Sequence, residues 1–145
     1  MRDILLGAVA LVVLATSLSL AQVQLLGPKL ALLTPYRAPI RVKEVEVATA
    51  LELFARGEAV FVDARESERY EAGHIPGAVN LSPDAGPEAA ALLPYGRLLV
   101  VYCDGPECGA AARLAEALSR RRVGPTAVLS DGWPAWLEAG GPTLP

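Results

Sequence analysis

The sequence has few of the side chains that most often bind metal ions. Its 145 residues include a single histidine and two cysteines. A structural zinc site of the usual kind takes four cysteine or histidine ligands, so we expect no metal site in this chain. The lone histidine also excludes an active site built on a histidine pair. Two cysteines are too few for a small secreted domain that depends on several disulfides.

An excess of basic side chains is absent as well. The chain has 13 lysines and arginines against 16 aspartates and glutamates, a net charge of -3. Proteins that bind the phosphate backbone need a basic surface, so we expect no nucleic-acid partner. Hydrophobic residues make up 52% of the chain, which is enough for a core, although many of them are concentrated at the N-terminus.

The N-terminal segment, residues 1–26, is predicted to form a hydrophobic helix outside the main domain. Residues 4–26 contain no charged side chain, and a helix of roughly 20 apolar residues can cross a bilayer. This segment is either a transmembrane anchor or a secretory signal peptide, with Ser19 and Ala21 as the small residues before a cleavage point. The sequence leaves both alternatives open.

The side of the membrane also stays open. Lys29, Arg37, Arg41 and Lys43 follow the hydrophobic segment, and the positive-inside rule would then keep the domain in the cytoplasm. A cleaved signal would instead export it. Residues 27–39 contain three prolines and one glycine, and we interpret them as a linker to a domain that spans residues 40–145.

From residue 40 onward, short apolar runs alternate with helix-forming stretches, which is typical of an α/β fold. Strands are expected at residues 43–47, 59–62, 77–81, 97–102 and 126–129, and helices at 48–56, 66–72, 86–93, 109–120 and 134–139. Strands that alternate with helices pair in parallel through crossovers. The sequence therefore predicts a mostly parallel central sheet of about five strands with flanking helices. The most hydrophobic run, 97–102, is expected at its centre.

The loop after this central strand is the candidate active site, because ligands bind at the carboxyl ends of strands in such sheets. Cys103 follows the strand directly, and a helix is expected to begin at the end of the loop. Unpaired amides and the helix dipole at that end favour an anion, so Cys103 is expected as a thiolate with a lowered pKa. The loop residues are Asp104, Gly105, Pro106, Glu107, Cys108 and Gly109. Gly105 and Gly109 would allow left-handed backbone angles there.

Three motifs resemble those of rhodanese-like domains. Residues 63–65 read DAR, and residues 70–80 read YEAGHIPGAVN. Residues 99–103, LVVYC, resemble the active-site strand and cysteine of the family, and residues 131–136, DGWPAW, resemble its closing segment. The resemblance runs from about residue 43 to residue 142, with the motifs in the family's order.

The resemblance implies a sulfurtransferase whose nucleophile is Cys103. In the family, sulfane sulfur passes from a donor to the cysteine as a persulfide and then to a thiol or protein acceptor. The donor is a small molecule or a protein-bound persulfide, and no metal or organic cofactor is needed. The sequence does not identify either partner.

Two features of the loop depart from the thiosulfate-using relatives. Asp104 and Glu107 stand where those relatives often carry a basic residue, so a doubly charged donor is disfavoured by repulsion. Cys108 is a candidate resolving thiol that attacks the persulfide, or a disulfide partner of Cys103. The alternatives to sulfur transfer are thus a thiol–disulfide redox module that uses both cysteines and a non-catalytic binding module tethered to the membrane.

Several polar and aromatic residues are expected to be structural. Asp63 is predicted to bond loop amides or Arg65, and both residues are possible supporting groups of the site. Arg65 is expected to form a buried ion pair with Glu71. His74 is expected to stabilise its turn, and the tryptophans of residues 131–136 are expected to serve as core and lid.

Overall fold

The computed structural model describes residues 42–85 and 87–145. The predictions for residues 1–26 and 27–39, and for a domain boundary at residue 40, lie outside the described residues and stay predictions. Among the described residues, no helix combines the length and the apolar character that a membrane crossing requires.

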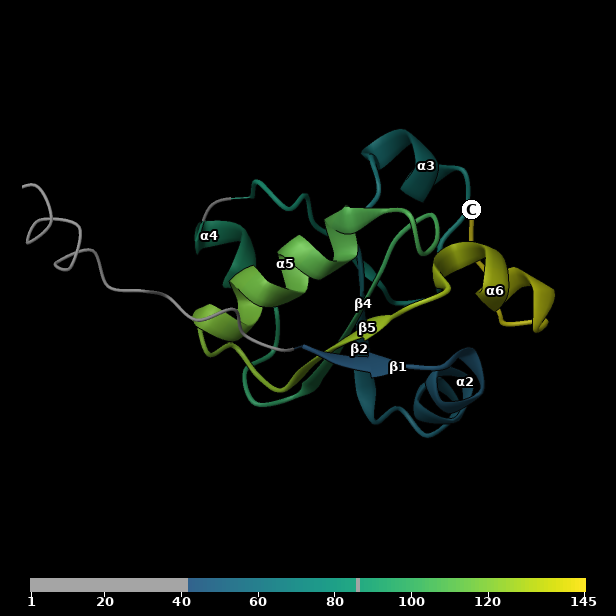
Figure 1. Ribbon diagram of the computed structural model, residues 1–145, viewed down its shortest axis with the longest axis horizontal. Coiled ribbons are helices and arrows are strands. Elements are labelled where there is room, and N and C mark those ends of the chain that lie inside the picture. Colours follow the sequence, from purple (N-terminus) through teal and green to yellow (C-terminus); the bar gives the residue numbers. More distant parts are fainter. Residues whose placement is uncertain (1–41, 86) are drawn as a thin grey trace, which may run out of the picture. The chain divides into compact units, whose positions relative to one another are not determined.

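The described residues form a five-stranded parallel sheet with helices on both faces (Figure 1). The strands are β1 (Lys43–Val45), β2 (Ala59–Asp63), β3 (Val79–Asn80), β4 (Leu98–Tyr102) and β5 (Thr126–Leu129). The helices are α2 (Val47–Ala55), α3 (Ser67–Glu71), α4 (Pro87–Ala90), α5 (Gly109–Arg120) and α6 (Gly132–Glu138). The strand order β1-β5-β4-β2-β3 places β4 at the centre, as predicted. The α/β prediction with about five mostly parallel strands is therefore confirmed.

Alternate side chains of β4 enter two separate cores, one on each face of the sheet. Leu99 and Val101 pack in the core that also contains Leu114 and Leu118 of α5. Val100 and Tyr102 point to the opposite face, into the core that contains Trp136 of α6. This alternation follows from the two-residue repeat of a strand. Because both faces are covered, the strand is apolar throughout, which explains its strong sequence signal.

Helix α6 packs on its face of the sheet through a cluster of aromatic rings. The Trp136 ring lies 5.5 Å from the Phe54 ring and 5.4 Å from the Phe61 ring, measured between centroids. The Trp136 indole N–H donates a hydrogen bond to the carbonyl of Pro142, 2.9 Å away. These contacts fix α6 next to the carboxyl end of β4, where the candidate active-site loop begins.

Candidate active site

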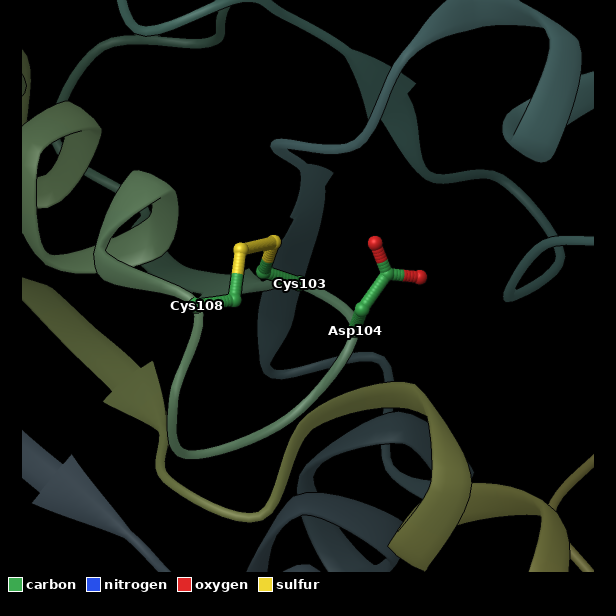
Figure 2. Close-up of side chains that lie close together, drawn as sticks. All are labelled: Cys103, Asp104 and Cys108. Carbon is green, nitrogen blue, oxygen red and sulfur yellow. A yellow bond between two sulfur atoms is a disulfide. The ribbon is translucent and has the colours of Figure 1, made fainter.

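Cys103 and Cys108 are joined by a disulfide across the loop between β4 and α5. The sulfur atoms are 2.02 Å apart, and the two Cα atoms are 6.2 Å apart (Figure 2). Cys103 is only 2% exposed and packs in the core on the α5 side of the sheet. The predicted thiolate is therefore not the state seen here, because the short loop brings the second sulfur within bonding distance and neither sulfur is ionised. Reduction has to precede any nucleophilic step at Cys103.

The backbone of the loop turns tightly at Gly105. Gly105 adopts a positive φ of 144°, and its carbonyl accepts a hydrogen bond from the Cys108 N–H at 3.0 Å. Cys108 then occupies the N-cap position of α5. The prediction for Gly105 is confirmed, but Gly109 does not have a positive φ. Gly109 is the first residue of α5, so its backbone is already helical, and a Cβ atom there would lie 3.3 Å from Nη1 of Arg113.

The start of α6 holds the loop at Cys103. The Trp133 N–H donates a hydrogen bond to the Cys103 carbonyl at 2.7 Å. Gly132 lies so close that a Cβ atom on it would be 2.4 Å from the Cys103 carbonyl oxygen and 2.7 Å from the Gly105 nitrogen. The motif at residues 131–136 predicts a closing segment, and the structure adds its contact with the loop. Its first residues thus set the position of Cys103.

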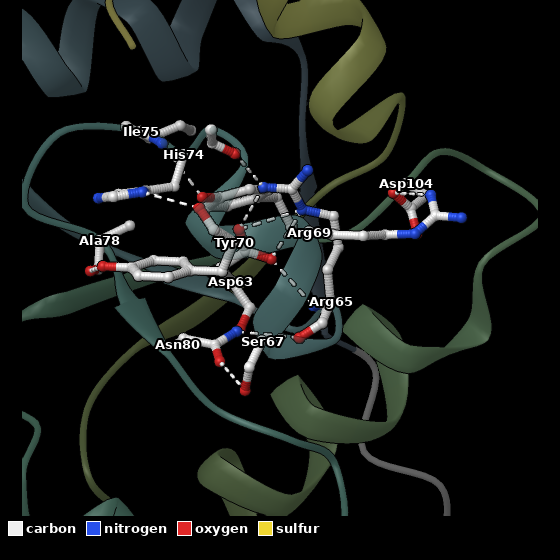
Figure 3. Close-up of polar contacts among 12 residues, drawn as sticks. Asp63, Arg65, Ser67, Arg69, Tyr70, His74, Ile75, Ala78, Asn80 and Asp104 are labelled. Atoms are coloured by element: carbon white, nitrogen blue, oxygen red, sulfur yellow. Dashed lines mark hydrogen bonds and ion pairs between the residues drawn. The ribbon is translucent and has the colours of Figure 1, made fainter. Parts of the chain in front are cut away.

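Asp63 and Arg65 form a buried ion pair behind the loop (Figure 3). Nη2 of Arg65 donates to Asp63 Oδ2 at 2.6 Å and also to the Gly73 carbonyl at 2.7 Å. The predicted bond between Asp63 and Arg65 is confirmed, because the Asp63 carboxylate accepts from both Nε and Nη2 of Arg65. The prediction that Arg65 pairs with Glu71 is wrong. Burial alone would lower the pKa of Arg65, but the hydrogen bonds and charge of Asp63 leave that pKa raised.

His74 has the structural role that the sequence predicted. Its ring stacks on the Tyr70 ring with centroids 3.8 Å apart, and its Nδ1 lies 3.0 Å from the Tyr70 carbonyl oxygen (Figure 3). The Tyr70 hydroxyl in turn donates to the Ala78 carbonyl at 2.7 Å. His74 also exchanges backbone hydrogen bonds with Leu144. These contacts tie the turn after α3 to the C-terminal residues of the chain.

Arg69 and Asp104 form an ion pair that sequence reasoning did not find. Nη1 of Arg69, on α3, lies 2.9 Å from Oδ1 of Asp104 in the loop. The two residues are 35 positions apart, and no local pattern indicates that they meet. The acidic loop is therefore partly compensated by a cation from another element. A carboxylate oxygen of Asp104 and the sulfurs of Cys103 and Cys108 all lie within 4.8 Å of one another.

A cavity of about 560 Å³ lies beside the loop and is of a size typical of small-ligand sites. Its charged lining side chains are Arg65, Arg69 and Asp104, and its apolar lining includes Trp133, Leu137 and Leu144. The Arg65 guanidinium lies over the Trp133 ring, 4.6 Å from its centroid. A second concavity of about 350 Å³ is lined by the loop itself, residues 104–108. Asp104 borders both concavities.

The site thus combines three features. A candidate nucleophile follows the central strand, a loop leads from it to the next helix, and a closing helix holds that loop. The model of the rhodanese-like domain matches residues 46–139. The chain belongs to the rhodanese-like domain family.

Proteins of different kinds are similar to this rhodanese-like domain. The HTH-type transcriptional regulator Rv0324 of Mycobacterium tuberculosis (strain ATCC 25618 / H37Rv) is 37% identical over 103 residues, which cover 67% of this chain and 44% of the regulator. The BH2092 protein of Bacillus halodurans has 24% identity and a TM-score of 0.64, covering 70% of this chain and 76% of that one, and shows the shared fold.

A thiosulfate sulfurtransferase from Pseudomonas aeruginosa is also similar in structure. It has 25% identity and a TM-score of 0.56, over 71% of this chain and 20% of the larger protein. The rhodanese-like domain therefore has a sulfurtransferase-type fold. The chain spans less than half of the transcriptional regulator and a fifth of the sulfurtransferase.

Proposed function

We propose that this domain is a sulfurtransferase that carries sulfane sulfur as a persulfide on Cys103. The position of Cys103 carries the proposal: it follows the central strand β4 of a rhodanese-like domain, and the start of α6 holds its carbonyl. In parallel sheets this end is where ligands bind. The thiosulfate sulfurtransferase among the structural relatives supports the same reaction class.

The reaction starts from the reduced loop. A dithiol or two thiols reduce the Cys103–Cys108 disulfide and are themselves oxidised to a disulfide. The Cys103 thiolate then attacks the sulfane sulfur of the donor, the bond between that sulfur and the rest of the donor breaks, and the donor leaves with the electron pair. The thiolate of the acceptor next attacks the outer sulfur of the persulfide. The bond between the two sulfurs breaks, and Cys103 leaves as a thiolate.

Intact-protein mass spectrometry tests this proposal. We expect the reduced full chain, incubated with a small organic persulfide, to gain the mass of one sulfur atom and to lose it on addition of a thiol acceptor. The Cys103→Ser variant should gain nothing, whereas Cys108→Ser, the matched control, should still form the adduct. If neither small organic persulfides nor thiosulfate give an adduct on Cys103, the domain is not a sulfurtransferase.

A thiol–disulfide redox module is the second candidate, and the Cys103–Cys108 disulfide is the observation that favours it. In this case both cysteines are required, and each turnover transfers two electrons without transfer of sulfur. A redox titration of the full chain would then give a midpoint close to that of cellular dithiol carriers. Loss of all activity in Cys108→Ser would favour this module, because sulfur transfer through Cys103 alone needs no second thiol.

We further propose that residues 1–26 either anchor the domain to a membrane or direct its export. Alkaline extraction of membranes separates the cases: an anchored chain stays in the pellet at full mass, whereas a cleaved one is released at reduced mass. The basic residues that follow residues 1–26 support a cytoplasmic side for the anchored form.

A third possible function is a non-catalytic binding module on a membrane. It predicts that Cys103→Ser leaves the biological role intact.

A further inference from the structure

Two charged side chains, Arg69 and Asp104, connect α3 to the two sulfurs of the loop. Nη1 of Arg69 lies 2.9 Å from Oδ1 of Asp104 (Figure 3). A carboxylate oxygen of Asp104 lies within 4.8 Å of both Cys103 Sγ and Cys108 Sγ (Figure 2). Arg69 is therefore separated from the sulfurs by a single carboxylate, although it belongs to a different element of the fold.

This placement has a direct electrostatic consequence for the reduced site. A carboxylate a few ångströms from a thiol disfavours the thiolate, because two negative charges repel each other. A cation that binds the carboxylate offsets this repulsion without touching the sulfur. The loop itself offers no such cation, since residues 103–108 contain two acidic and no basic side chains.

We propose that Arg69 is a positioning residue for the active site: by pairing with Asp104, it offsets the negative charge that otherwise lowers the thiolate fraction of Cys103. This inference rests on the proposed function only in that Cys103 is the nucleophile. Arg69 thus makes an acidic loop compatible with thiolate chemistry, and it does so from outside the loop.

The elements around the loop carry further charged groups, and each lies in a position other than that of the Arg69–Asp104 pair. Asp63 and Arg65, at the end of β2, are buried and paired with each other. Glu107 lies within the loop, and Arg113 of α5 lies near Gly109. Asp131 precedes α6. These groups are unchanged when Arg69 or Asp104 is replaced, so the difference between variants isolates the Arg69–Asp104 pair.

A purely mechanical role for the ion pair predicts a different pattern. If the pair only tethers the loop to α3, removing either partner releases the loop, and both single variants change the reactivity of Cys103 in the same direction. If charge is what matters, the two variants act in opposite directions. Loss of Arg69 leaves the Asp104 carboxylate without its paired cation, whereas loss of the Asp104 charge removes the repulsion itself.

The experiment measures alkylation of Cys103 by iodoacetamide as a function of pH. The full chain with Cys108→Ser, reduced beforehand, has a single thiol, and mass spectrometry follows the adduct. In this background we expect Arg69→Met to slow alkylation at pH 7 about threefold and to move the profile up by about half a pH unit. Asp104→Asn should speed alkylation by a similar factor. The Arg69→Met/Asp104→Asn double variant should return toward or above the starting rate, and Arg69→Lys should stay close to it.

Arg56→Met is the matched control. The Arg56 side chain is 64% exposed, as is that of Arg69, and it also pairs with a carboxylate, Glu52, but on α2 and away from both concavities. It should leave the alkylation profile unchanged. Shifts in the same direction for Arg69→Met and Asp104→Asn, or no shift in either, overturn the proposal. Alkylation needs no sulfur donor, so this outcome is distinct from a failure to form the persulfide, which would overturn the proposed function alone.

Discussion

Gly132 shows how the absence of one side chain shapes the candidate active site. Its φ of 65° lies in the left-handed region, and the space where a Cβ would stand is filled by the backbone of Cys103 and Gly105. Both conditions favour glycine, since it alone lacks the atom that would collide. The close approach lets the Trp133 N–H reach the Cys103 carbonyl. The loop and the start of α6 therefore depend on each other.

Replacing Gly132 with alanine is expected to destabilise the protein and displace the loop. A left-handed conformation costs an alanine about 1–2 kcal/mol, and the clash with backbone atoms adds to that cost. We expect the free energy of unfolding, measured by urea denaturation, to fall by about 3 kcal/mol or more. Alkylation of reduced Cys103 should change as well.

Gly140→Ala is the matched control for this variant. Gly140 has a similar φ of 73°, but a Cβ on it would meet no atom within 4 Å. Gly140→Ala should lose only the conformational part of the stability, about 1–2 kcal/mol, and leave the reactivity of Cys103 unchanged. Equal losses in the two variants would show that the close packing against the loop contributes nothing.

Tyr102 is expected to make stability depend on alkaline pH. Burial, together with the charge of Asp63, raises the pKa of Tyr102 well above its usual value. Above about pH 10 the unfolded chain loses the tyrosine proton while the folded chain keeps it. The unfolded state then binds fewer protons, so the free energy of unfolding falls as pH rises.

Urea denaturation at several alkaline pH values measures this slope. Tyr102→Phe should flatten it, at the cost of the hydrogen bond that the hydroxyl accepts from the Ile75 N–H. Tyr95→Phe, at a tyrosine that is largely exposed, should keep the slope of the unmodified protein. A Tyr102→Phe variant with an unchanged slope would contradict the assigned cause.

At the scale of elements, β4 and α5 form the base of the site. Helix α5 was predicted at residues 109–120, and it buries Ala111, Leu114, Ala115 and Leu118 against the sheet as a stripe along one face. The sequence predicts both elements closely, because the helix consists largely of strong helix formers and the strand is a continuous apolar run. Helix α6 begins two residues earlier than predicted, at Gly132, because the contact of Gly132 with the loop sets its start.

Leu118→Ala tests the contribution of α5. Leu118 is 1% exposed in the core between α5 and the sheet. Its truncation should lower the free energy of unfolding by about 2–5 kcal/mol, measured by urea denaturation. Leu92→Ala, at a leucine that is 73% exposed, should cost less than about 0.5 kcal/mol. Similar losses at both positions would mean that α5 does not pack as described.

At the scale of the whole molecule, the disulfide is expected to be a minor contributor to stability. It closes a loop with a sequence separation of 5, and a loop this short removes little entropy from the unfolded chain, about 2 kcal/mol. The cores on both faces of the sheet hold the fold together without it. The domain should therefore remain folded when the loop is reduced for catalysis.

Denaturation with and without reductant checks this expectation. Reduction should lower the free energy of unfolding by about 2 kcal/mol. The circular-dichroism spectrum should stay close to that of the oxidised protein. The Cys103→Ser/Cys108→Ser variant should be insensitive to reductant. Complete unfolding on reduction would contradict the view that a catalytic cycle passes through the reduced form.

The sequence by itself determined the succession of strands and helices along the chain, the central place of β4 and the position of Cys103 at the end of that strand. These features depend on the alternation and hydrophobicity of short segments and on short motifs, all of which are local in the chain. The tertiary structure decided which groups surround the sulfurs: Arg69 beside Asp104, and Gly132 against Cys103. Such pairs lie tens of residues apart, and the local patterns of one segment carry no information about the partner that packing brings to it.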